Sequence, residues 1–203
     1  MQHITVTALD AEGRTEIRSA LRDARRGGTA VLLSGAAGSW AHKRQSGDAA
    51  LAPTDFHPLL LAVIAHPAPV IVALQGAVMG FGLALAAAAD VRLVSEGTSF
   101  RVGGPGVALE TGSYRALVGL IGRGQADALV YSDRELDAAE AVQHGIVTAM
   151  LTDAADAEER ATELSTAAAA AFKRAASARI APQLTEALEY DAWLALIAAG
   201  ESP

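Results

Sequence analysis

A glycine-rich turn has the clearest chemical potential in this sequence. It follows the apolar run Val70–Leu74, which is typical of a strand buried on both faces, and precedes Leu83–Ala89, which predicts a buried helix. Between them stand Gly76, Gly80 and Gly82. Glycines at such a turn let backbone N–H groups approach a ligand, and the helix dipole favours negative charge, so an anionic oxygen is the expected guest. The alternative is that the glycines only allow close packing of strand and helix.

Composition and charge exclude several classes of function. The chain has 203 residues and a formal net charge of -7, and only 4% of its residues are aromatic. It therefore lacks the basic surface and the stacking groups that nucleic-acid binding requires. It contains no cysteine, which excludes disulfides and thiolate chemistry and fits a reducing compartment.

Neither a signal peptide nor a membrane span is predicted. The first residues do not combine a positive region with an apolar core. The stretch between Asp55 and Asp90 has no Lys, Arg, Asp or Glu and exceeds the ~18 residues of a span. It is interrupted, however, by histidines, prolines and a glutamine (His57, His66, Pro67, Pro69 and Gln75). We therefore expect a soluble cytoplasmic protein without membrane contact.

Strands and helices are predicted to alternate along the chain. The predicted strands are 4–9, 30–33, 70–74, 91–94, 99–102 and 146–151, and the predicted helices are 14–26, 56–65, 83–89, 113–121, 125–131 and 137–144. This alternation, with near-continuous apolar strands, indicates an α/β fold with a parallel sheet. Residues 103–106 predict a glycine turn. Residues 36–55 predict a long loop of the kind that is usually functional.

The first predicted helix and the C-terminal region have distinct patterns. Helix 14–26 places apolar residues on one face (Ile17, Ala20, Leu21 and Ala24) and arginines on or near the other, interpreted as solvated (Arg14, Arg18, Arg22, Arg25 and Arg26). After about residue 152 strands cease, and alanine-rich helices are predicted at 154–176 and 182–199. The chain is thus expected to divide into an α/β core, 1–151, and a helical region, 152–203, that makes oligomer contacts.

Three stretches, in this order, carry a resemblance to a known family. They are VLLSGAAGSW, PVIVALQGAVMGFGLALAAAADVRLVSEGTSF and GRGQADALVYSDRELDAAEAVQHGIVTAML. They resemble the crotonase superfamily, also called the enoyl-CoA hydratase/isomerase family. The resemblance implies a spiral of strand–strand–helix turns with C-terminal helices. It also implies an acyl-thioester substrate, on CoA or a carrier protein, no further cofactor or metal, and a homo-oligomer, a trimer or a multiple of it.

The chemistry that this family shares is stabilisation of a thioester enolate by two backbone N–H groups. By resemblance, one belongs to His42, after Trp40-Ala41, and the other to Phe81, between Gly80 and Gly82. One preorganised donor of this kind is worth roughly 2.7–4 kcal/mol of transition-state stabilisation. Trp40 and the two glycines are therefore expected to contribute to the substrate site.

The first of these loops departs from the family pattern. Where the family usually has Ala-Gly, this chain has His42-Lys43. His42 could act as a general base, or only its amide could matter. Lys43 and Arg44 could contact CoA phosphates, with a solvated loop as the alternative.

Both catalytic glutamates of the family's hydratases are absent. The resemblance places Ala84 at the first glutamate position, two residues after the glycine turn, and Gly104 at the second. Alanine and glycine cannot transfer protons, so ordinary hydration by this pair is not expected. Gly104-Pro105 resembles family members in which glycine replaces the second glutamate, such as dihydroxynaphthoyl-CoA synthases.

One carboxylate remains in a position that suits proton transfer. Counted back from Gly122, Glu110 matches the acid–base aspartate of the family's dienoyl-CoA isomerases. A carboxylate there could move a proton on a substrate carbon, with a pKa tuned by burial. The alternative is that Glu110 caps the helix that begins at Ser113, since acidic residues are favoured near helix starts. Tyr114 is a further candidate donor, with packing as its alternative.

The sequence thus leaves two hypotheses from different classes. The first is an enzyme that stabilises the enolate of an acyl thioester, as an isomerase or a decarboxylase (a lyase) rather than a standard hydratase. The second is a non-catalytic protein that binds a thioester or a partner and has lost the catalytic carboxylates. Only the isomerase requires Glu110 in the pocket.

Overall fold

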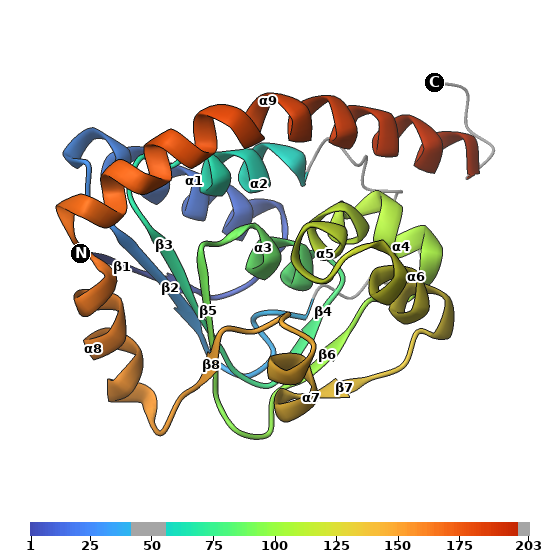
Figure 1. The fold of residues 1–203 in the computed structure, drawn as a ribbon, viewed down its shortest axis with the longest axis horizontal. Coiled ribbons are helices and arrows are strands. Elements are labelled where there is room, and N and C mark those ends of the chain that lie inside the picture. Colours follow the sequence, from blue (N-terminus) through green and yellow to red (C-terminus); the bar gives the residue numbers. More distant parts are fainter. Residues whose placement is uncertain (42–55, 199–203) are drawn as a thin grey trace.

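The computed structural model describes the backbone of residues 1–41 and 56–198, and side chains except at residues 109–110, 154, 179–184, 191–192 and 195–198. At its centre is a parallel five-stranded sheet in the order β1-β2-β3-β5-β8 (Figure 1). Its strands are Gln2–Val6 (β1), Val31–Gly35 (β2), Val70–Leu74 (β3), Val91–Val94 (β5) and Ala149–Met150 (β8). The predicted α/β fold with a parallel sheet is confirmed.

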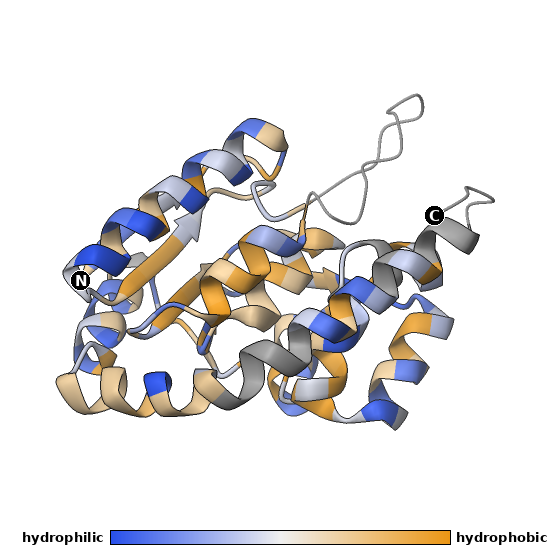
Figure 2. Ribbon diagram, turned by 90° about the horizontal axis from the view of Figure 1, so that it is seen from above, coloured by the Kyte–Doolittle hydropathy of each residue, from blue (hydrophilic) through white to orange (hydrophobic). Residues whose placement is uncertain are grey.

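The two faces of this sheet bury different side chains, because successive side chains of a strand point to opposite faces. One face joins the main core with three helices, α1 (Ala11–Gly27), α2 (His57–Ile64) and α3 (Phe81–Ala88). The other face presents Leu32, Ile71 and Leu93 to a single helix, α8 (Ala154–Leu164), through Ala157 and Ala161. Figure 2 shows the apolar strands beneath α1, whose outer surface is largely hydrophilic.

A second, three-stranded sheet gives the fold its spiral. It consists of β4 (Ala77–Met79), β6 (Ser99–Arg101) and β7 (Leu136–Asp137), of which β6 and β7 are antiparallel. β3, β4 and α3 form one strand–strand–helix turn, and β5, β6 and α4 (Gly104–Glu110) form the next. The predicted spiral is therefore present. The short strands β4 and β7 were not predicted. Residues 103–106 were predicted as a turn, but residues 104–106 form the start of α4.

Helix α1 corrects one prediction about the arginines. Its boundaries follow from capping, since the side chain of Asp10 accepts from the N–H of Gly13 and Gly28 is left-handed, with φ 62°. Arg14, predicted on the solvated side, is only 5% exposed. It lies three residues before the buried Ile17 and thus on the same helix face. Its guanidinium donates to the Leu9 carbonyl oxygen at 2.8 Å, which offsets the cost of burial.

Four helices follow β6 in the chain and precede the C-terminal helices, with β7 between the third and the fourth. They are α4, α5 (Ser113–Ile121), α6 (Arg123–Ser132) and α7 (Ala138–Gln143). The predicted helix at 113–121 is confirmed, and Asp137 caps α7 as predicted, through a capping box with Glu140. Together α4, α5 and α6 stand beside α3 (Figure 1), and α5 packs directly against α3.

The C-terminal helices divide at a different residue from the one predicted. α8 ends at Leu164, and α9 (Ala167–Ala198) runs on through Pro182. The break between α8 and α9 ends at Thr166, whose side-chain oxygen accepts a hydrogen bond from the N–H of Ala169 at 3.1 Å. Thr166 thus caps the start of α9. α9 lies across α2 and is anchored to the core by the buried Lys173, whose Nζ donates to the carboxylate of Asp90 and to the Val63 carbonyl oxygen (Figure 1).

No helix among residues 1–41 and 56–198 is both long and apolar enough to cross a lipid bilayer.

Candidate active site

The glycine turn leaves a backbone donor available at the start of α3. Gly80 has φ 57°, a conformation that side chains strongly disfavour, and it directly precedes Phe81, the first residue of the helix. No acceptor among the described residues takes the backbone N–H of Phe81. First-turn amides have no partner within their own helix, so this N–H can bind an anionic oxygen.

The chain at Trp40-Ala41 lies directly against this turn. The Trp40 carbonyl oxygen accepts from the Met79 N–H at 3.2 Å, and Ala41 forms a parallel bridge with Met79. Position 82 must be glycine, because an added Cβ would lie 1.7 Å from the Trp40 oxygen. Both predicted loops therefore meet in space, as an oxyanion site shared between them requires.

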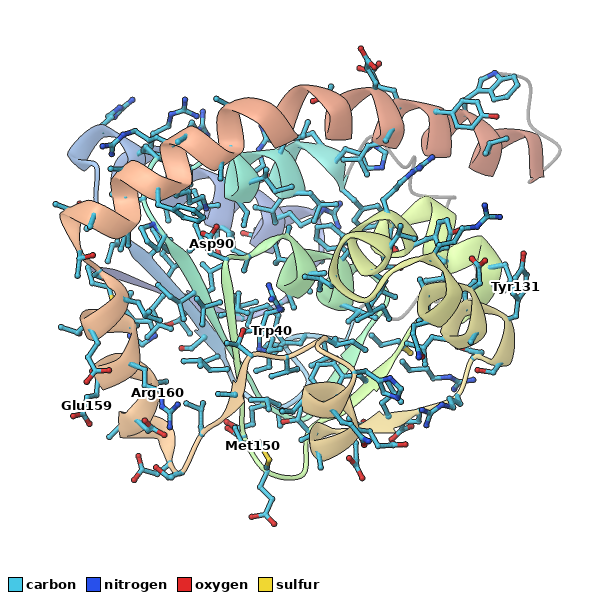
Figure 3. All side chains as sticks on the ribbon, viewed as in Figure 1. Trp40, Asp90, Tyr131, Met150, Glu159 and Arg160 are labelled. Atoms are coloured by element: carbon cyan, nitrogen blue, oxygen red, sulfur yellow. The ribbon has the colours of Figure 1, made fainter. Side chains whose placement is uncertain are left out.

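Two aromatic side chains hold this junction in place. The rings of Trp40 and Phe81 are fully buried, and Figure 3 shows Trp40 in the interior. The ring of Phe81 lies 4.6 Å from the ring of Phe56, and the guanidinium of Arg14 lies 4.7 Å from the Phe56 centroid. Trp40 and Phe81 thus belong to the core through their side chains, and Phe81 can serve the site through its backbone. The buried Trp40 Nε1 has no hydrogen-bond partner in the described part of the chain.

Several predicted site residues lie outside the described residues. These are His42, Lys43 and Arg44, so the second amide of the site and the phosphate contacts stay predictions. Glu110 is the last residue of α4, and its side chain is not described. Its neighbours in the chain, Thr111 and Ser113, are 1% and 0% exposed. The end of α4 therefore lies inside the protein.

A cavity of about 300 Å³ runs along α3, between α2, α5 and α9. Its walls include Ala84, the first of the two positions where the glutamates are absent, and Gly112, two residues after Glu110. At its far end lie Asp90 and Lys173, and burial lowers the pKa of Lys173 although Asp90 opposes this. This cavity was not predicted from the sequence. Its signal is a stripe of small residues at helical spacing, Ala84, Ala87 and Ala88 on α3, with Gly112 and Ala116 opposite.

Gly104 is the second position where a glutamate is absent, and it begins α4 with φ 84°. Beside it, Asp133 accepts from the Gly103 N–H at 2.7 Å and pairs with Arg101 at 2.7 Å. Burial raises the pKa of Asp133, but the hydrogen bonds from Arg101 and Gly103 outweigh it, so the pKa lies below its ordinary value. Asp133 thus stays ionised and stabilises this corner of the fold.

Tyr114, predicted as a substrate contact, is engaged within the protein. Its hydroxyl donates to Asp127 at 2.8 Å. This hydrogen bond, together with burial, raises the pKa of Tyr114 above its ordinary value. The bond joins α5 to α6, which agrees with the packing role left open by the sequence.

Comparison with known proteins decides the family. The sequence pattern that describes the enoyl-CoA hydratase/isomerase family matches residues 3–197 of this chain. This chain belongs to that family. As a member of the crotonase superfamily it has the strand–strand–helix spiral, the glycine turn and the C-terminal helices in the expected order.

Individual relatives of this family agree with the assignment. A probable enoyl-CoA hydratase of Mycobacterium tuberculosis is 34% identical over 174 residues, which cover 83% of this chain and 71% of the relative. A probable mitochondrial enoyl-CoA hydratase of Arabidopsis thaliana is 36% identical over 98 residues, 47% of this chain and 32% of the relative. This chain therefore matches only part of the length of these relatives.

Solved structures of the family share the fold. The enoyl-CoA hydratase of Bacillus halodurans superposes with a TM-score of 0.77 at 19% identity, over 94% of this chain and 88% of that chain. The enoyl-CoA hydratase of Bacillus anthracis superposes with a TM-score of 0.69 at 23% identity, over 96% of this chain and 86% of that chain.

Proposed function

We propose that this protein binds an acyl thioester, on CoA or on a carrier protein, and stabilises its enolate, as an isomerase or a decarboxylase. One observation carries the proposal: the Trp40-Ala41 segment lies against the glycine turn, at whose end the Phe81 N–H has no acceptor among residues 1–41 and 56–198. The thioester oxygen would accept from Phe81 and from His42, and its growing negative charge would strengthen both hydrogen bonds.

In the isomerase reaction, a carboxylate moves a proton between two substrate carbons. The Glu110 carboxylate would remove a proton from C2 of a 3-enoyl thioester and return it to C4, giving the 2-enoyl thioester. Support comes from the position of the Glu110 backbone, two residues from Gly112 in the wall of the cavity. An apolar wall around a carboxyl group raises its pKa and lets it act as both base and acid.

In the decarboxylase reaction, no base is needed for enolate formation. The C–C bond to the carboxylate of a malonyl-type thioester breaks, its electron pair forms the enolate, and CO₂ leaves. The enolate then takes a proton from water at C2. The same two backbone donors would stabilise the charge, so the absence of side-chain acids at positions 84 and 104 does not impair this reaction.

The cavity along α3 would hold the acyl group. Its volume of about 300 Å³ corresponds to roughly ten water molecules at ~30 Å³ each. Apolar residues and glycines from α2, α3, α5 and α9 make most of its wall, which suits a hydrocarbon chain.

A non-catalytic thioester-binding or partner protein is the alternative function. The observation that favours it is the pair Ala84 and Gly104 at the two glutamate positions. Such a protein would keep the Phe81 turn for binding and would not need Glu110.

We also propose contacts between copies through the C-terminal region, in a trimer or a multiple of it. Large apolar side chains are exposed on α9, namely Phe172, Tyr190 and Trp193. Light scattering on the purified protein tests this, and a monomer at micromolar concentration contradicts it.

The substitution Glu110→Gln tests the reaction type. The variant is assayed with 3-enoyl and malonyl thioesters beside the matched surface control Glu135→Gln. Isomerase chemistry predicts a loss of about 10²–10⁴-fold with Glu110→Gln, because a positioned acid–base group is removed, and no loss with the control. Full activity of Glu110→Gln on the malonyl thioester favours decarboxylation. Binding without turnover in wild type favours the non-catalytic alternative.

A further inference from the structure

A serine, a histidine and a glutamate come together on the sheet face opposite the main core. The hydroxyl of Ser34 lies 2.6 Å from Nε2 of His3. The other ring nitrogen, Nδ1, lies 3.3 Å from Oε1 of Glu158. A serine hydrogen-bonded to a histidine, with a carboxylate close to the other ring nitrogen, is the set of groups that can activate a hydroxyl as a nucleophile.

The register of the sheet and the position of α8 create this cluster. β1 and β2 are parallel, with His3 beside Leu32 and Thr5 beside Ser34. Leu32 belongs to the face covered by α8, so Ser34, two residues further along the strand, faces the same way. Glu158 comes from α8 itself. Residues far apart in the sequence therefore meet at one edge of the sheet.

The cluster lines a cavity of about 210 Å³ at the carboxyl ends of the strands. His3, Ser34 and Glu158 all belong to its wall, and it has room for roughly seven water molecules at ~30 Å³ each. Gln75 also lines it, and its backbone N–H donates to no acceptor in the described part of the chain. In an ester-cleaving site, this amide would be the donor to an oxygen that gains negative charge.

We propose that Ser34, His3 and Glu158 form a second catalytic site, which hydrolyses short-chain carboxylic esters. Glu158 holds the proton of His3 on Nδ1, so that Nε2 accepts from the Ser34 hydroxyl. The Ser34 oxygen attacks the ester carbonyl carbon while its proton passes to Nε2. The C–O bond to the alcohol then breaks, and the alcohol leaves with that proton.

The remaining step restores the serine. Water attacks the acyl-serine carbonyl and gives one proton to His3, the acid leaves, and His3 returns the proton to the Ser34 oxygen. The balance is ester plus water to acid plus alcohol. The site lies on the α8 face of the sheet, whereas Phe81 lies in the core on the other face, so the esterase proposal does not depend on the thioester chemistry.

A fluorophosphonate probe followed by peptide mass spectrometry tests this site on the full chain. Wild type should be labelled at Ser34, and Ser34→Ala should lose the label together with the hydrolysis of p-nitrophenyl acetate. The control Ser19→Ala, at an exposed serine of α1, should behave as wild type. Removing the base with His3→Gln should slow labelling by about 10²–10⁴-fold.

His3 and Glu158 are on the surface, so their variants test the same step without disturbing the core. Glu158→Gln should slow labelling by a smaller factor than His3→Gln, because it only orients the ring. The proposal is overturned if Ser34 of the wild type stays unlabelled, or if His3→Gln or Glu158→Gln is labelled at the wild-type rate.

Discussion

The Trp40 carbonyl oxygen occupies the space that a side chain at Gly82 would need. An added Cβ would lie 1.7 Å from this oxygen and 2.7 Å from the carbonyl carbon of the same residue. Gly82 is the second residue of α3, and the close approach joins the loop after β2 to the start of that helix. Gly82 thus packs against the loop after β2, not between strand and helix as the sequence alternative proposed, and this packing places Trp40-Ala41 beside the glycine turn.

We expect Gly82→Ala to separate these two segments. The free energy of unfolding should fall by at least the ~1–3 kcal/mol typical of overpacked cores, and thioester turnover should fall with it. Gly124→Ala is the matched control, since position 124 of α6 is exposed and a Cβ there meets nothing within 4 Å. It should be neutral or slightly stabilising. Urea unfolding measures both, and equal stability of the two variants would refute the packing argument.

How much of this could be predicted from sequence depends on how local each signal is. Val70–Leu74 and the capped helix 138–143 have strong local patterns and are where they were predicted. Arg14 was predicted on the solvated face of its helix but is buried, because its partners, Leu9 and Phe56, are known only from tertiary packing. β4 and β7 have three and two residues, too few for a period-two pattern.

The candidate site divides in the same way. The glycine turn before Phe81 was predictable, because glycines at this spacing indicate a backbone that needs positive φ or close approach of another segment. The cavity along α3 was not, since a stripe of alanines also fits a tightly packed helix. The Ser34–His3–Glu158 cluster depends on strand register and on the placement of α8, which no local pattern encodes.

Hydration of 2-enoyl thioesters should be weak or absent. Ala84 is fully buried and Gly104 has no side chain, so neither can activate water or protonate C2. The loss of the enoyl absorbance in the presence of enzyme measures hydration. A turnover near the ordinary enzyme median, on the order of 10 per second, would show that other residues perform this chemistry.

Acyl-chain preference should respond to the cavity along α3. Ala116 lines it from α5, so Ala116→Phe should raise KM for long acyl chains and leave short chains unaffected. Ala128→Phe, at an exposed position of α6, is the control. KM is measured for thioesters of increasing chain length. An equal effect on all chains would place the acyl group elsewhere.

Stability should fall as the pH drops below about 6.5 because of His66. Its side chain is 1% exposed, and burial lowers its pKa from the ordinary 6.5 although a hydrogen bond to the Ala68 carbonyl opposes this. Between the lowered pKa and 6.5 the unfolded chain binds more protons, so unfolding is favoured as pH falls. One proton contributes at most about 1.4 kcal/mol per pH unit. Urea unfolding gives the free energy of unfolding at each pH from 7 to 5. Over this range the free energy should fall less steeply for His66→Gln than for wild type, and the same slope for both would contradict this prediction.

The proposed role of the Phe81 backbone is tested most directly by comparing Phe81→Pro with Phe81→Ala. Both variants lose the ring that packs on Phe56, but only proline lacks the N–H, and the first position of a helix accepts proline. Thermal unfolding establishes that the two variants are equally folded. The measurement is kcat on the thioester that the wild type turns over. An oxyanion donor at Phe81 predicts a kcat about 10²–10³-fold lower for Phe81→Pro than for Phe81→Ala. Equal kcat values for the two variants would contradict it.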